Sequence, residues 1–97
     1  PRDKIYIDPG FGFGKTLEHN VMLFRAIDRF VATGFPVIVG VSRKRMISEL
    51  LQNPSEHRLI GSVVLAVLAA QRGASILRVH DVDETAKAIK ILQQIDF

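Results

Sequence analysis

Charged side chains stand at the ends of the apolar runs in this sequence. Asp8 closes the first run, whereas Arg78 and His80 lie in the last one. Because Arg78 and His80 are two residues apart, both side chains project from the same face of a strand. A guanidinium beside an imidazole matches the oxygens of a phosphate or carboxylate, so this pair predicts an anion site. Asp81 leaves a structural alternative open, since it can pair with Arg78 or orient His80.

A basic cluster follows the second apolar run, where Ser42 precedes Arg43, Lys44 and Arg45. Ser42 is expected to cap a short helix, and cations in its first turn oppose the helix dipole by about 0.3 to 1 kcal/mol each. An anion bound at that helix start would explain them, because free N–H groups, dipole and side-chain charge meet there. For Arg43, solvated surface charge is an alternative interpretation.

The glycine-rich segment 10–16, GFGFGKT, invites comparison with phosphate-binding loops. A Walker A loop would need glycine at Pro9, and a dinucleotide fingerprint would need glycine at Lys15, so neither motif fits. The glycines are instead expected to turn the chain sharply and to present Phe11 and Phe13 outward, where an aromatic ring can stack on a planar ligand. Alternatively, both rings cover the rim of the fold.

Composition narrows the class of protein. The chain has 97 residues, of which 47% are hydrophobic and 24% charged, as is typical of one globular domain. Its formal charge of +3 is spread along the chain, which favours an anionic small molecule over a nucleic acid. No run approaches the roughly 20 apolar residues of a membrane span, and no cysteine is present, so we expect a cytoplasmic protein. His19 and His57 lack a ligand spacing, and no metal role is predicted for them.

The apolar runs alternate with helical patterns in the order strand, helix, repeated three times. Strands are expected at 4–8, 36–40 and 75–80. Helices are expected between Thr16 and Gly34, from Ser42 to the stop at Asn53-Pro54, from Ser55 to about Arg72, and after Asp83 as an N-cap. This alternation predicts a parallel α/β sheet joined by right-handed crossovers. Three units cannot close a (β/α)8 barrel, which needs eight and about 250 residues, so the chain is interpreted as part of one rather than as an isolated open sheet.

The helices differ in how much apolar surface they offer. The first has a single stripe expected to pack on the sheet, and the last has a similar stripe with Lys87 and Lys90 on the solvent side. The helix through 59–70 is apolar on nearly every side, which predicts a second partner and favours a homodimer. The two stripes are Leu17, Val21, Phe24, Ile27 and Val31 in the first helix, and Ala86, Ile89, Leu92 and Ile95 in the last. The helix after Ser42 carries Met46, Ile47, Leu50 and Leu51.

Three segments together resemble the C-terminal part of the dihydropteroate synthase family: DPGFGFGK at 8–15, SRK at 42–44 and RVHD at 78–81. The resemblance spans nearly the whole chain. It implies a TIM barrel of which residues 1–97 form the sixth, seventh and eighth βα units. It also implies the condensation of 6-hydroxymethyl-7,8-dihydropterin diphosphate with p-aminobenzoate to 7,8-dihydropteroate, with release of diphosphate, in folate biosynthesis.

The resemblance also assigns residues to the two substrates. It implies Mg²⁺ with its ligands outside this chain, a pterin cation formed by cleavage of the C–O bond, and a homodimer through the last helices. Arg45 occupies a position that is often serine in the family. The implied pterin residues are Asp8, Phe13, Gly40 and Lys44, those for p-aminobenzoate are Ser42, Lys44 and Arg45, and those for diphosphate are Arg78 and His80, with Asp8 and Lys44 catalytic.

Two other functions remain open at this point. A pterin-binding methyltransferase would share the carboxylate that binds pterin, but methyl transfer needs no diphosphate pocket, so the SRK and RVH segments argue against it. A non-catalytic barrel fragment would bind pterin or diphosphate, if either, without turnover.

Overall fold

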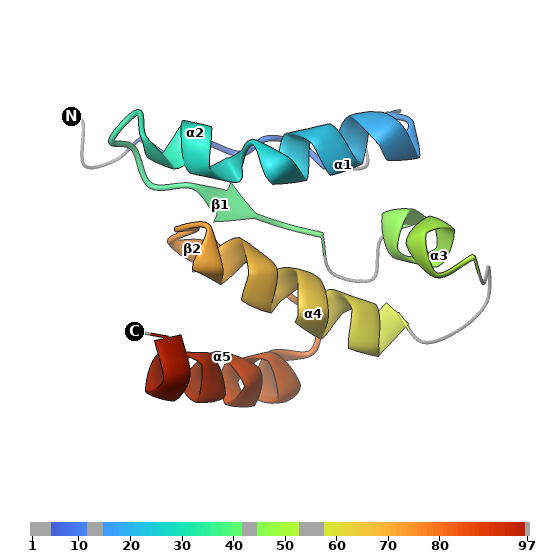
Figure 1. The fold of residues 1–97 in the computed structure, drawn as a ribbon, viewed down its shortest axis with the longest axis vertical. Coiled ribbons are helices and arrows are strands. Elements are labelled where there is room, and N and C mark those ends of the chain that lie inside the picture. Colours follow the sequence, from blue (N-terminus) through green and yellow to red (C-terminus); the bar gives the residue numbers. More distant parts are fainter. Residues whose placement is uncertain (1–4, 12–14, 42–44, 53–57, 97) are drawn as a thin grey trace.

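The computed structural model describes residues 5–11, 15–41, 45–52 and 58–96 (Figure 1). The predicted helix starts at Ser42 and Ser55, and the stop at Asn53-Pro54, lie outside these residues. Within them the order of elements is α1 (Leu17–Arg25), α2 (Ile27–Val31), β1 (Ile38–Val39), α3 (Arg45–Leu51), α4 (Arg58–Gln71), β2 (Ile76–Leu77) and α5 (Val82–Asp96).

The predicted parallel sheet is present, with the second apolar run in its middle. β1 pairs with β2 in parallel, in the register Ile38 with Ile76. On its other side, Ile7 forms a parallel bridge to Val37, and the Ile38 N–H donates to the Ile7 carbonyl at 2.8 Å. The strands are shorter than predicted, and residues 5–8 form a single bridge. An apolar run predicts burial, whereas the length of a strand is set by the neighbouring backbone that can pair with it.

The helix predicted between Thr16 and Gly34 is divided at Ala26, whose φ of −92° and ψ of 4° leave the helical region. The Ala26 N–H is shared between the Met22 and Leu23 carbonyls, each at 3.1 Å. Thr16 is the N-cap of α1 as predicted and accepts the His19 N–H at 3.2 Å. The predicted apolar stripe is buried or half-buried on both sides of the break, so both helices cover the core.

α5 begins one residue before its predicted cap. Asp83 lies in its first turn, so the assignment of Asp83 as N-cap was wrong. Lys87 is exposed as predicted and pairs with Asp83 at 3.0 Å, and Lys90 is exposed too. The predicted stripe is only partly buried, because Leu92 is 7% exposed while Ile95 is 77% exposed.

The core lies between the helices and the sheet, with α4 packed against α3 and α5 (Figure 1). Phe11 is 1% exposed, and its ring lies 5.8 Å from that of Phe24, so the expectation that Phe11 points outward was wrong. Full burial of a phenylalanine side chain stabilises a fold by about 1.5 to 3 kcal/mol relative to leaving it exposed, which favours the buried position of Phe11. The buried cluster comprises Phe11, Phe24, Ile27, Val37, Val39, Val41, Met46, Ile47, Leu65 and Ala69.

Candidate functional site

The carboxyl ends of the parallel strands bring residues far apart in sequence to one edge of the sheet. Asp8 follows the bridge at Ile7, Gly40 follows β1, and Arg78 follows β2. The Arg78 N–H donates to the Val39 carbonyl at 2.9 Å, which continues the pairing beyond β2. In parallel α/β folds this edge is where ligands bind, so the predicted site residues lie where the fold places function.

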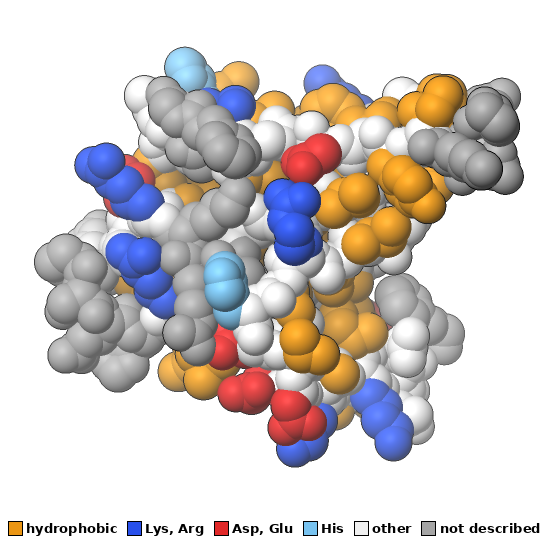
Figure 2. Space-filling model, turned by 180° about the vertical axis from the view of Figure 1, so that it is seen from behind, with side chains coloured by type: hydrophobic (Ala, Val, Ile, Leu, Met, Phe, Trp, Pro, Cys, Tyr) orange, Lys and Arg blue, Asp and Glu red, His pale blue; other side chains and the backbone are white. Residues whose placement is uncertain are grey.

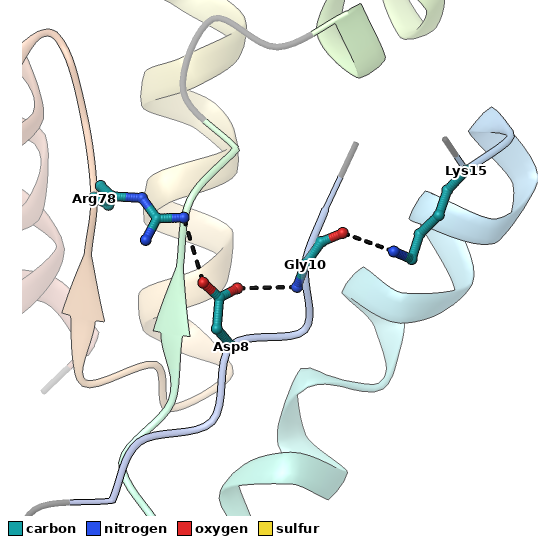
Figure 3. Close-up of polar contacts among 4 residues, drawn as sticks. All are labelled: Asp8, Gly10, Lys15 and Arg78. Carbon is teal, nitrogen blue, oxygen red and sulfur yellow. Dashed lines mark hydrogen bonds and ion pairs between the residues drawn. The ribbon is translucent and has the colours of Figure 1, made fainter. Parts of the chain in front are cut away.

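Asp8 and Arg78 meet across 70 residues of sequence (Figure 3). The Arg78 Nη2 atom lies 3.4 Å from Asp8 Oδ2, while the other carboxylate oxygen, Oδ1, accepts the Gly10 N–H at 2.9 Å. The two charged side chains are 58% and 39% exposed, and a pair this open to water contributes at most about 1 kcal/mol to stability. Both groups therefore remain able to exchange their contact for a ligand.

Gly40 makes room for the Arg78 side chain. A Cβ atom at Gly40 would lie 2.6 Å from Nη2, 2.9 Å from Nε and 3.0 Å from Cζ of Arg78. The guanidinium thus lies directly over the Gly40 backbone, and a side chain there would displace it. The resemblance implies that Gly40 lines the pterin site, which stays a prediction, while the structure places Gly40 against the Arg78 guanidinium.

A turn at Asp8-Pro9-Gly10 holds the carboxylate. Gly10 has a φ of +73°, which glycine adopts without the steric penalty of a Cβ. Its carbonyl accepts a hydrogen bond from Lys15 Nζ at 2.9 Å (Figure 3). No role was predicted for Lys15 from the sequence. Its position just before the cap of α1, where a cation opposes the helix dipole, could have indicated that it has a specific partner.

A cavity of about 440 Å³ lies between the starts of α1 and α3. Its wall contains two cations, Lys15 and Arg45, and the Glu49 carboxylate. Arg45 Nε lies 3.6 Å from Glu49 Oε1, and the Arg45 side chain is 88% exposed. Each of these helices follows, along the chain, a segment that pairs in the sheet. It is lined by Lys15, Thr16, Leu17, Asn20, Arg45, Met46 and Glu49.

The structure brings together part of the predicted site. Asp8, Gly40 and Arg78 form one group, Arg45 stands at the start of α3, and His80 is exposed two residues beyond Arg78. The remaining predicted residues, Phe13, Ser42 and Lys44, lie outside the described residues.

The described residues offer no cluster of side chains that would hold a magnesium ion by itself. Mg²⁺ prefers oxygen ligands such as carboxylates, yet these residues contain no group of three or more His, Cys, Asp or Glu side chains that could hold an ion. The Asp8 carboxylate contacts an N–H and a guanidinium.

Two surface properties bear on the kind of ligand. On the face shown in Figure 2, Lys and Arg side chains are spread out and interleaved with acidic ones. A nucleic-acid interface would gather the basic side chains into a stripe or patch. Among the described helices, none is long and apolar enough to cross a membrane.

Comparison with known proteins defines the class. The profile of a family described as "Pterin binding enzyme" matches residues 1–80, and the chain belongs to this family. Among curated relatives, the dihydropteroate synthase of Escherichia coli K12 is 47% identical over 92 residues, which are 95% of this chain and 33% of that protein. The dihydropteroate synthase of Neisseria meningitidis serogroup C is 52% identical over 89 residues, or 90% of this chain and 31% of that protein.

Solved structures show the same likeness in three dimensions. The Yersinia pestis dihydropteroate synthase gives a TM-score of 0.89 at 47% identity, over 97% of this chain and 44% of that one. A dihydropteroate synthase from Coxiella burnetii in complex with pteroic acid gives 0.88 at 49% identity, over 96% of this chain and 35% of that one. The resemblance read from the motifs is confirmed, and the chain spans about a third of the length of the curated relatives it matches.

Proposed function

We propose that this chain forms the sixth, seventh and eighth βα units of a dihydropteroate synthase barrel and supplies part of its active site. The Asp8–Arg78 pair over Gly40, at the carboxyl edge of a parallel sheet, carries this proposal. Similar proteins support it, because they include a Xanthomonas albilineans dihydropteroate synthase in complex with 7,8-dihydropteroate. The reaction is the condensation of dihydropterin diphosphate with p-aminobenzoate.

Asp8 and Arg78 suit the two ends of the pterin substrate. The amino-pyrimidine edge of a pterin offers two adjacent N–H groups, and a carboxylate can accept both. Arg78 presents a planar set of donors that matches diphosphate oxygens, and His80 adds a further donor. The substrate therefore replaces a solvent-exposed ion pair with two N–H donors for Asp8 and an anionic diphosphate for Arg78.

The same arrangement favours charge separation during the reaction. When the bond between the pterin methylene carbon and the diphosphate oxygen breaks, the electron pair leaves with diphosphate and the pterin becomes cationic. Asp8 stabilises the cation through the ring, and Arg78 stabilises the departing anion. The amine of p-aminobenzoate then attacks the methylene carbon and loses a proton. No protein nucleophile is needed, in keeping with a chain that contains no cysteine.

The p-aminobenzoate subsite is proposed at the start of α3. Arg45 lines the cavity there, and its charge attracts a carboxylate, while Ser42 and Lys44 directly precede it in sequence. Phe13 and Lys44 complete the pterin pocket in this proposal. Any magnesium used by the complete enzyme is held by residues outside this chain.

The function is tested in a completed chain, in which this sequence replaces the matching 92 residues of the E. coli relative. Diphosphate release from dihydropterin diphosphate and p-aminobenzoate is measured. We expect Asp8→Asn and Arg78→Ala each to reduce turnover on the order of 10²-fold, as expected for loss of one charge-stabilising group. Asp83→Asn on α5 and Arg29→Ala on α2 are the matched controls and retain full activity.

Other outcomes assign other functions. Turnover within threefold of the unmodified chain in both site variants would contradict the proposed roles. Pterin binding without diphosphate release would favour a non-catalytic pterin-binding barrel. Methyl transfer from a methylated pterin would identify a methyltransferase.

We also propose a homodimer through the outer face of α4. Ile60 and Val64 are 64% and 49% exposed on this helix, although both are apolar. A buried charge at such an interface lacks a partner, so Val64→Asp is expected to yield a monomer of the completed chain by light scattering. The exposed Lys90→Asp on α5 introduces the same residue as a control. A Val64→Asp variant that stays dimeric would exclude this face.

A further inference from the structure

A continuous series of contacts links α1 to β2 through the site. Lys15 Nζ donates to the Gly10 carbonyl at 2.9 Å, and the Gly10 N–H donates to Asp8 Oδ1 at 2.9 Å. Arg78 Nη2 then contacts Asp8 Oδ2 at 3.4 Å (Figure 3). Lys15 is therefore two hydrogen bonds from the carboxylate without touching it.

Gly10 is the point in this series that most needs support. Its φ is +73°, but because glycine has no Cβ, this residue could adopt many other backbone conformations as readily. The Asp8 contact holds the peptide plane before the Gly10 Cα atom, and the Lys15 contact holds the plane after it. Together the two bonds fix both backbone torsions of Gly10, and with them the N–H that orients Asp8.

The hydrogen bond between Lys15 and Gly10 lies in partly buried surroundings. Phe11 is buried beside Gly10 and anchors one end of the glycine segment in the core. Lys15 is half-buried and stands directly before the Thr16 cap of α1, where the helix dipole disfavours a cation. The Gly10 carbonyl oxygen, which has a partial negative charge, accepts a hydrogen bond from the ammonium and compensates for this position.

We propose that Lys15 is a positioning residue that holds the Asp8 carboxylate in its pterin-binding orientation by fixing Gly10. The inference rests on the proposed function, since it assigns Asp8 to the pterin. Removing the ammonium group leaves the charge of Asp8 intact but releases the turn that orients it. Pterin affinity then falls, because binding must restore the order that Lys15 supplied beforehand.

Binding of 6-hydroxymethylpterin to the completed chain, measured by calorimetry, tests this role. We expect Lys15→Met to raise the Kd about tenfold, because the turn loses its closing bond. Lys15→Arg keeps a charged donor and is expected to stay within threefold of the unmodified chain. Lys87→Met is the matched control, because it also removes an ammonium group that has a polar partner but lies on α5, and the Kd of this variant is expected to be unchanged. An unchanged Kd in Lys15→Met would overturn the proposal.

A double-mutant cycle shows whether Lys15 acts through Asp8. Asp8→Glu keeps the charge but extends the side chain by one methylene, which displaces the carboxylate from the Gly10 N–H. We expect Lys15→Met to change the Kd less than twofold in this background, whereas tenfold losses in both backgrounds would overturn the proposal. If Lys15→Met does not fold, as judged by thermal unfolding, the same cycle is measured with Lys15→Gln.

Failure of this inference is distinguishable from failure of the proposed function. If Asp8→Asn leaves pterin binding unchanged, the pterin assignment itself is wrong. If Asp8→Asn abolishes binding while Lys15→Met has no effect, only the positioning role is lost.

Discussion

The core beneath the sheet and the site at its carboxyl edge are built on opposite principles. Ile27 and Ala69 are fully buried among apolar neighbours, whereas Asp8 and Arg78 are 39% and 58% exposed and meet through one contact. Burial of apolar surface gives the core its contribution to stability, while the exposed charges contribute little until a ligand engages them. This difference predicts that folding and activity depend on separate residues, which substitutions would affect independently.

Truncation in the core is expected to produce the largest effect. Ile27→Ala removes a side chain with 0% exposure and leaves a cavity, so the free energy of unfolding should fall by about 2 to 5 kcal/mol. Chemical denaturation of the completed chain measures the loss. Ile95→Ala, at a position 77% exposed, is the matched control and is expected to change stability by less than about 0.5 kcal/mol. Equal losses in the two variants would contradict the division between core and surface.

Overfilling the contact between α3 and α4 is expected to rank second. A Cβ atom at Gly61 would lie 2.2 Å from Cγ2 of Ile47, which is 1% exposed and has little room to move. Gly61→Ala should therefore destabilise the protein by about 1 to 3 kcal/mol, although alanine is the better helix former.

The same denaturation measurement in an Ile47→Ala background isolates this contact. Because Ile47→Ala removes Cγ2, adding Gly61→Ala should then cost nothing or stabilise the helix by up to about 1 kcal/mol. A full loss in both backgrounds would mean that Ile47 is not the cause.

Apolar periodicity predicted the buried face of α1 and α2, because burial there follows from residue type and spacing. It was wrong for Leu50 and Leu51 in α3 and for Ile95 in α5, which are 45%, 47% and 77% exposed. Phe24 and Ile27 are buried as predicted on either side of the break at Ala26. The break itself and the short strands depend on which backbone groups are near enough to pair, and periodicity does not contain that information. Phe11 was assigned wrongly because the glycines around it indicated a surface loop, whereas packing against Phe24 buries it.

For the site, the position of a residue in its strand was the informative signal. The resemblance assigned Asp8 to the pterin and Arg78 to the diphosphate of one substrate. The carboxyl ends of parallel strands lie at one edge of the sheet, and the structure brings the two side chains to 3.4 Å there. Their direct contact was not predicted, and the alternative partner considered for Arg78 was Asp81. The contact between Lys15 and Gly10 was missed because it depends on the conformation of the intervening segment.

Crowding at Gly40 is expected to affect activity more than stability. Gly40→Ala would place a Cβ atom 2.6 Å from Arg78 Nη2 and displace a side chain that is exposed and can move. We expect kcat/KM for dihydropterin diphosphate to fall about tenfold, which corresponds to about 1.4 kcal/mol of transition-state stabilisation. The free energy of unfolding should change by less than about 1 kcal/mol. A large loss of stability with normal kcat/KM would assign Gly40 to the core.

The smallest effect is expected at a second exposed ion pair, which joins two residues of one helix and to which no ligand role is assigned. Asp83 Oδ2 lies 3.0 Å from Lys87 Nζ on α5, and the two side chains are 75% and 73% exposed. Asp83→Asn should lower the free energy of unfolding by only about 0.2 to 0.5 kcal/mol, and 1 M salt should remove most of this difference by screening. Asp8→Asn should change stability by a similarly small amount while reducing turnover on the order of 10²-fold. Similar stability changes with very different turnover would show that Asp8 serves the ligand, whereas a loss of several kcal/mol in Asp8→Asn would show that its contact with Arg78 holds the sheet together.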